Sequence, residues 1–243
     1  MTAARFFFLL PFMAVAMLGQ SVTAESRTAQ GQQLLELSLS SDRNYSNPYT
    51  DVDLYVTFFG PAGAQVRRPA FWDGGGTWRV RFLPTREGPW SWRSTCSETS
   101  DRGLHDRRGS LTAIRYQGAN ALLQHGLLTM SAGHRNVRHS NGAPFMLVAD
   151  TAWSLAWRGT AQSVTVYAED RAKKGFNATL LMSVQPDRKA QGPRDRSSVG
   201  GFDVGFEDLS AGHLQRINIE YFRYMDQLMQ ILSEFPASLH DRE

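Results

Sequence analysis

The sequence of 243 residues contains a single cysteine, Cys96. One thiol cannot form an intrachain disulfide, so the fold must be stabilised by core packing. Cys96 follows Trp90, Trp92 and Ser94 at intervals of two residues. This spacing places it on one face of a strand and predicts a small buried side chain. Burial argues against cysteine–histidine catalysis, which needs an accessible thiolate.

The sequence also lacks clustered charge and a metal-binding motif. The formal net charge is +3, and the basic residues are scattered along the chain. Scattered charge of this size predicts neither a nucleic-acid partner nor an acidic membrane surface. The six histidines are isolated from one another in the sequence, so we expect no metal site and no cofactor.

Long apolar runs are absent except near the N-terminus. Residues 6–18 are almost entirely apolar, Arg5 precedes them, and the small-residue pattern Val22-Thr23-Ala24 follows. This arrangement is typical of a secretory signal peptide and is too short for a membrane span. We therefore expect residues 1–24 to be cleaved and the chain to be secreted or periplasmic, without stable membrane insertion.

From residue 34 to about residue 116 the apolar residues recur with the period of β-strands. Two such series are Val52, Leu54, Val56 and Phe58, and Trp78, Val80 and Phe82. Glycine and proline turns separate the series. The pattern predicts an immunoglobulin-like β-sandwich domain over residues 30–116, after a flexible polar leader at residues 25–33.

The glycine-rich tip Phe71-Trp72-Asp73-Gly74-Gly75-Gly76 has two interpretations. Exposed aromatic side chains at this edge could stack on sugar rings. Alternatively, Trp72 packs into the core or against the next domain, and the glycines supply positive φ angles. We favour the second interpretation.

After residue 116 the pattern changes to strands alternating with helices. Residues 127–130 and 136–139 have the pattern of a short hairpin. The apolar run at residues 145–149 predicts a strand buried on both faces of a parallel sheet. A helix over residues 161–174, capped by Thr160, and a second buried strand over residues 176–184 complete two βα units.

A long polar loop and one further helix follow. Residues 187–209 lack periodicity and include the carboxylates Asp187, Asp195, Asp203 and Glu207. Any of these four could touch a substrate, but solvation is the ordinary role of loop carboxylates. Asn218 is placed to cap a helix that runs to about Glu234. The apolar stripe of this helix predicts packing against the sheet.

Candidate binding residues stand where the two buried strands end. Asp150 follows the first strand, and Trp153 and Trp157 are spaced to share a helical face. Gln185 follows the second strand. Ligands of α/β folds bind at the carboxyl ends of strands, so we predict these four residues as substrate-binding. Asp150 could instead cap a short helix over residues 152–157, a role compatible with binding.

Five segments in this order resemble one known family: NPYTDVDLYVTFFGP (47–61), FWDGGGTWRVRF (71–82), GLHDRRGSL (103–111), PFMLVADTAWSLAWR (144–158) and RAKKGFNATLL (171–181). Over about residues 34–234 the chain resembles secreted bacterial proteins that pair an N-terminal β-sandwich domain of unknown function with an apiosidase-like (β/α)8 glycoside hydrolase domain. The resemblance implies an extracellular carbohydrate-active protein that acts on side chains of plant polysaccharides such as pectin.

The resemblance also implies that the barrel is incomplete here. Catalytic carboxylates of barrel hydrolases normally lie on later strands, and a complete TIM barrel needs ~250 residues. We therefore expect residues 117–243 to form an N-terminal part of the barrel without the catalytic pair. Asp150 and Trp153 match the first-strand motif of the family as substrate contacts. The alternative function is a non-catalytic glycan-binding or surface interaction protein.

Overall fold

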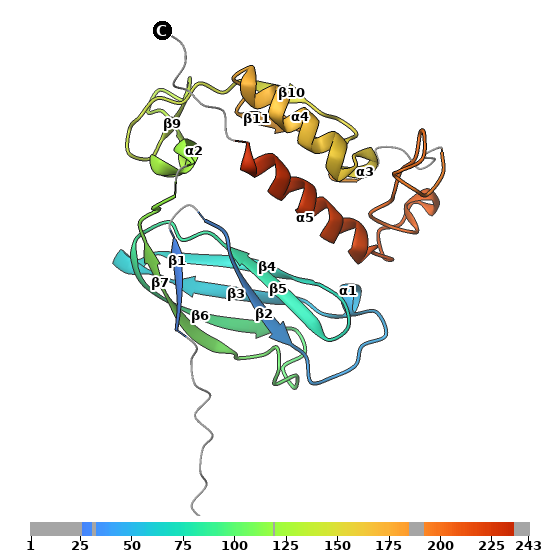
Figure 1. Ribbon diagram of the computed structural model, residues 1–243. Coiled ribbons are helices and arrows are strands. Elements are labelled where there is room, and N and C mark those ends of the chain that lie inside the picture. The colour runs from blue at the N-terminus through green and yellow to red at the C-terminus, as the bar shows by residue number, and fades with distance from the viewer. Residues whose placement is uncertain (1–25, 31–32, 119, 185–191, 236–243) are drawn as a thin grey trace, which may run out of the picture.

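The computed structural model describes residues 26–30, 33–118, 120–184 and 192–235. The chain has a mostly β N-terminal part followed by a part that contains the longer helices (Figure 1). The predicted signal peptide, Gln185 and Asp187 lie outside the described residues.

The N-terminal part is one seven-stranded sheet in the order β1-β7-β6-β3-β4-β5-β2. Strand β4 carries the sheet from one half to the other, because residues 65–69 pair with β3 and residues 70–72 pair with β5. The two halves enclose an apolar core, and a short helix α1 (Pro48–Asp51) precedes β3. The strands are β1 (Ser26–Gln30), β2 (Leu35–Ser40), β3 (Leu54–Phe59), β4 (Gln65–Trp72), β5 (Thr77–Phe82), β6 (Gly88–Cys96) and β7 (Arg108–Ile114).

The core of this sheet consists of the side chains that the two-residue period selects. The inward series of β3 and β5 are buried, and Phe58 stacks on Phe82 with ring centroids 3.8 Å apart. Trp90 meets the edge of Phe82 at 5.0 Å. Cys96 is buried as predicted, and burial raises the pKa of its thiol. Aromatic contacts of this kind stabilise the core beyond the area that they bury.

The prediction of a flexible leader at residues 25–33 is wrong for its first half. Strand β1 pairs in parallel with β7, from Ser26 opposite Ser110 to Gln30 opposite Ile114. An edge strand is held by backbone hydrogen bonds, which a polar sequence can make as well as an apolar one. Ala29 is buried in the core, and a single small residue gives no detectable period in the sequence.

The chain leaves β7 through α2 (Ala121–Gln124) and enters a hairpin of β8 (Leu128–Met130) and β9 (Val137–His139). The two hairpin strands are antiparallel, which confirms the predicted hairpin. Next come β10 (Ala149–Thr151), α3 (Leu155–Arg158), α4 (Ala161–Lys173) and β11 (Ala178–Leu180). The 3-10 turn η2 (Leu209–Ala211) precedes α5 (Ile219–Glu234), and another 3-10 turn, η1 (Pro61–Gly63), lies between β3 and β4.

The βα pairing is confirmed, but the strands are shorter and less buried than predicted. Strands β10 and β11 pair in parallel and are joined through α4, whose Thr160 forms the predicted N-terminal cap. The predicted buried run is exposed at Met146 and Leu147, and the strand itself covers only residues 149–151. Continuous apolar runs become buried strands only when neighbours cover both faces, and β10 and β11 form a sheet of two strands. An incomplete TIM barrel is thus not confirmed.

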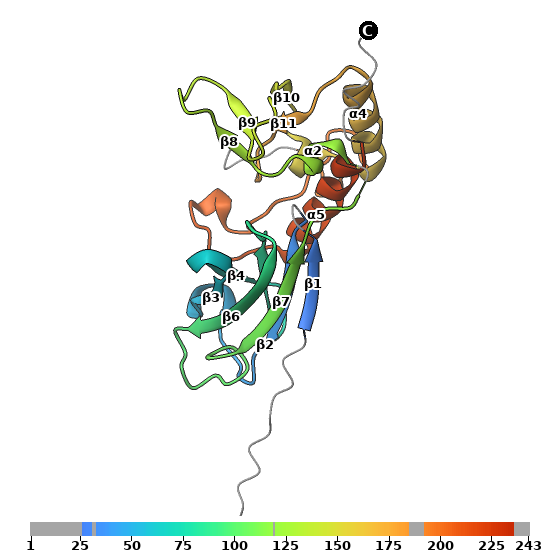
Figure 2. The ribbon, with the colours of Figure 1, turned by 90° about the vertical axis from the view of Figure 1, so that its left-hand side faces the viewer.

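Helices α4 and α5 lie together on one side of β10 and β11, and the β8–β9 hairpin lies on the other side (Figure 2). Asn218 accepts a hydrogen bond from the Tyr221 amide, as expected of the cap of α5. Two apolar clusters hold this part together, one around Trp157, Phe202 and Tyr221 and the other around Leu155, Val164 and Leu228. Helix α5 contributes to both clusters and also faces the β4–β5 part of the sheet (Figure 1).

Candidate functional site at the ends of β10 and β11

Asp150 lies in the middle of β10, opposite Thr179 of β11. Its Oδ2 forms an ion pair with Arg171 of α4, 2.7 Å from Nε, without a well-directed hydrogen bond. The Tyr167 hydroxyl donates weakly to the same oxygen at 3.4 Å. Oδ1 accepts a hydrogen bond from the Thr151 amide. The carboxylate is therefore turned toward α4, and a ligand would share it with Arg171.

The two tryptophans after Asp150 have different environments. Trp153 is half exposed, and its carbonyl accepts a hydrogen bond from Met182, which links the two strand ends. Trp157 is buried beside Phe202 and Tyr221, with the Arg158 guanidinium 4.3 Å from its ring. Helix α3 begins only at Leu155, so Trp153 lies outside it and the two rings do not share a helical face.

The structure does not support the alternative that Asp150 caps this helix. Ser154 stands at the N-cap position of α3, and Asp150 bonds its own neighbour in the strand. The predicted helix over residues 152–157 is thus shifted toward its carboxyl end. The reason is that the strand pairing extends to Thr151 and leaves the next residues in a turn.

Carboxylates of the loop after β11 are paired rather than free. Arg194 donates to Asp203 at 2.9 Å and to both oxygens of Glu207 at 3.0 and 3.1 Å. The hydrogen bonds from Arg194 lower the pKa of Glu207, against a smaller opposing effect of burial. Asp195 accepts hydrogen bonds from Ser197 and Ser198 and thereby closes a local turn. These interactions give the three carboxylates structural roles in ordering the loop.

Arg196 fixes the same loop to α3. Its Nη1 donates to the carbonyl oxygens of Ala156 at 2.8 Å and Gly159 at 3.2 Å. Its guanidinium lies 4.4 Å from the Tyr224 ring centroid, a cation–π contact with α5. Burial lowers the pKa of Arg196. The loop is therefore held between α3 and α5 by a partly buried cation.

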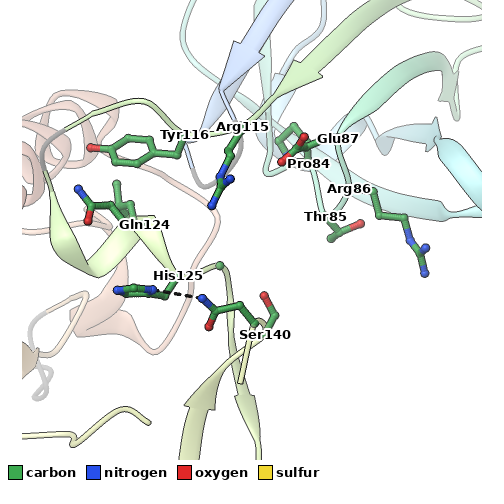
Figure 3. A pocket seen from close by; sticks show the side chains of 12 residues that line it. Pro84, Thr85, Arg86, Glu87, Arg115, Tyr116, Gln124, His125 and Ser140 are labelled. Carbon is green, nitrogen blue, oxygen red and sulfur yellow. Dashed lines mark hydrogen bonds between the residues drawn. The ribbon is translucent and has the colours of Figure 1, made fainter. Parts of the chain in front are cut away.

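A polar cleft of about 330 Å3 lies between the sheet and the α2–β9 segment (Figure 3). Arg115 and His125 both project into it, and His125 Nδ1 lies 3.1 Å from the side-chain amide of Asn141. Glu87 is the one carboxylate among the residues that line the cleft. Glycoside hydrolysis of the usual kind requires two carboxylates, so this cleft does not supply that chemistry.

Within the described ranges, no three histidine, cysteine or carboxylate side chains gather as a metal site. Over the same residues, no helix has the length and apolar character needed to cross a membrane. His125 and His139 have ring centroids 5.4 Å apart, a proximity that the sequence spacing does not suggest.

The sequence predicts Asp150 and Trp153 at the strand end, but it does not reveal the two side chains of α4 that contact the Asp150 carboxylate. Arg171 and Tyr167 occupy the α4 face that covers β10 and β11, and Tyr167 also lies 3.0 Å from the Thr179 hydroxyl. Their spacing of four residues along a helix was the available signal, since such residues share one face. Trp157 belongs to the apolar core, and Gln185 lies outside the described residues.

Comparison with known proteins gives two family matches. Residues 131–235 match the apiosidase-like catalytic domain, and residues 29–97 match a domain of unknown function, DUF5060. A search of curated proteins finds no match.

Among solved structures, the chain is similar to a "putative glycoside hydrolase" from Bacteroides vulgatus, with a TM-score of 0.58 and 22% sequence identity. The similarity covers 85% of this chain and 40% of that protein, so the chain spans well under half of its length. The Lin-41 filamin domain gives a TM-score of 0.29 at 14% identity, over 39% of this chain and 90% of that domain. A TM-score this low does not establish a shared fold. The apiosidase-like match over residues 131–235, with DUF5060 ahead of it, supports an apiosidase-like glycoside hydrolase family protein.

Proposed function

We propose that the chain is part of an extracellular glycoside hydrolase that acts on the side chains of plant polysaccharides. The observation that carries the proposal is the family match over residues 131–235, which includes both strand ends and the loops that follow them. In βα folds these loops form the ligand-binding edge. Export is proposed from the signal-peptide pattern of residues 1–24.

Trp153 and Asp150 have distinct roles in this proposal. The exposed Trp153 ring offers an apolar face on which a sugar ring can pack. Asp150 retains acceptor capacity on Oδ1, which accepts one hydrogen bond from Thr151. Because Arg171 engages its other oxygen, we assign Asp150 to substrate positioning and not to proton transfer. We assign none of the described residues to the catalytic carboxylate pair.

Affinity electrophoresis in gels that contain branched pectic polysaccharides tests the carbohydrate role. The chain of residues 25–243 should be retarded, and Trp153→Ala should remove most of the retardation. Phe59→Ala is the matched control, because Phe59 is an exposed aromatic residue of β3. Migration that no plant polysaccharide changes would overturn the proposal.

A hydrolysis assay tests the assigned role of Asp150. Reducing-sugar release and aryl-glycoside turnover should both be absent for residues 25–243, because none of the described residues is assigned to the catalytic pair. Turnover by this chain that Asp150→Asn abolishes would contradict the positioning role.

Mass spectrometry of the exported protein should give a mature chain that begins at Glu25.

A further inference from the structure

A cleft of about 280 Å3 lies where α5 faces the sheet. One wall comes from α1, β4 and β5 of the sheet, and the other comes from α5 and the residues just before it. Its volume lies just below the ~300–1,000 Å3 range of small-molecule sites, which suits a ligand of one ring. Clefts between packed units are frequent ligand sites, so the chemistry of the lining decides what could bind.

Aromatic side chains form much of both walls. Tyr49, Phe71 and Trp72 come from the sheet side, and Phe206 and Phe222 come from the α5 side. The walls meet where Tyr49 and Phe206 have ring centroids 5.9 Å apart. Tyr49 and Phe71 remain more than one-third exposed, and the Arg81 guanidinium lies over one face of Phe71, 4.8 Å from its ring centroid. The Trp72 indole is held in place by its hydrogen bond to the Gly75 carbonyl at 2.8 Å.

The charges that line the cleft are paired with one another. Arg81 forms a two-point ion pair with Asp226, and Arg223 Nε donates to Asp73 at 3.0 Å. Two cations and two anions leave the cleft without net charge, which argues against an ionic ligand. Guanidinium groups carry more donors than these contacts use, and the carboxylates carry further lone pairs. Hydroxyl groups of a neutral ligand could therefore bond at the rim.

From this combination we infer that the cleft is a second carbohydrate-binding site, which holds one neutral sugar ring against the sheet aromatics. The inference rests on the proposed carbohydrate role but concerns a site separate from the β10–β11 edge. A sugar ring has an apolar C–H face and a rim of hydroxyls, which matches aromatic walls bordered by neutralised ion pairs. The ring would lie on Phe71 and the edge of Trp72.

Saturation-transfer NMR on residues 25–243 tests the inference, with methyl β-galactopyranoside and methyl α-arabinofuranoside as probes. Both neutral glycosides should receive saturation at their ring protons, and galacturonate should bind at least tenfold more weakly. Phe71→Ala and Tyr49→Ala should each weaken binding at least tenfold. Phe59→Ala is again the control, since its ring is exposed on the same sheet but does not line the cleft.

Trp153→Ala separates this inference from the proposed function. If the cleft binds the probe, the signal persists in Trp153→Ala and is lost in Phe71→Ala. A signal that is lost in Trp153→Ala and unchanged in Phe71→Ala would overturn the inference and leave the proposed function standing. The absence of any signal with the neutral probes would also overturn the inference, and the gel assay with polymers would still test the function.

Discussion

Asp73 joins the sheet to α5, and removing its carboxylate should loosen that contact. The side chain is only 10% exposed and accepts hydrogen bonds from Arg79 of β5 and Arg223 of α5. Arg223 also donates to the Asp73 carbonyl at 2.6 Å. Arg79 and Arg81 share Glu36, and Arg81 pairs with Asp226, so the network returns to α5. Asp73→Ala breaks the network near one end.

The expected loss of stability follows from the number and exposure of these contacts. Hydrogen bonds to charged groups contribute roughly 1.5–3 kcal/mol when buried, and much less when solvent reaches the partners. Both arginines are more than one-third exposed and can be rehydrated after the substitution. We therefore expect Asp73→Ala to lower the free energy of unfolding by about 2 kcal/mol. For a chain of this length, that corresponds to a decrease in Tm of roughly 4–8 °C.

Differential scanning calorimetry of residues 25–243 measures this decrease. Asp53→Ala is the matched control, because Asp53 precedes β3 on the same sheet and is exposed. The control should shift Tm by less than about 1 °C, as expected of surface substitutions. Equal shifts in the two variants, or no shift in Asp73→Ala, would refute the reasoning that an ion-pair network around the buried Asp73 carboxylate couples α5 to the sheet.

Three further predictions concern the sheet. Phe82→Ala should lower the free energy of unfolding by about 3–5 kcal/mol, because Phe82 is fully buried between Phe58 and Trp90, whereas Phe59→Ala should have little effect in the same chemical-denaturation experiment. Cys96 should react with a thiol reagent only after unfolding, since burial shields it and raises its pKa; rapid labelling of the native chain would contradict this. The free energy of unfolding should decrease as the pH falls from about 5. Burial raises the pKa of Asp73 and Asp101, but hydrogen bonds outweigh this effect and hold the pKa of both carboxyls below the usual range. The unfolded chain therefore binds protons at a higher pH than the folded chain does, and acid favours unfolding. Chemical unfolding at pH 5 and pH 3 should show a smaller decrease for Asp73→Asn than for the parent chain.

Asp101 shows how a residue without a recognised motif can organise a loop. Its side chain is fully buried, and it accepts hydrogen bonds from Tyr45 at 2.8 Å and from the amides of Gly103 and Leu104 at 3.0 Å. The sequence indicates only a turn at residues 101–105. Partners that lie more than fifty residues away, such as Tyr45, cannot be read from local spacing.

The sequence by itself determined most of the sheet and the starts of helices α4 and α5. The inward residues of β3 and β5, the hairpin of β8 and β9, and the caps Thr160 and Asn218 all follow from local rules of period and capping. Such rules are readable because the partners lie within a few residues along the chain. The family resemblance rests on the same local segments, and the family matches confirm it.

Tertiary structure alone decided which of these elements are covered and which charges meet. The apolar run before Asp150 is exposed because a sheet of two strands has too few neighbours to cover both of its faces. The neighbouring elements, and not the sequence of the run, decide its burial. Asp73 meets Arg223 across 150 positions of sequence, and Asp150 meets Arg171 only because α4 crosses over β10 and β11. Burial and ion pairing are properties of pairs of elements, so they become fixed only when the chain packs.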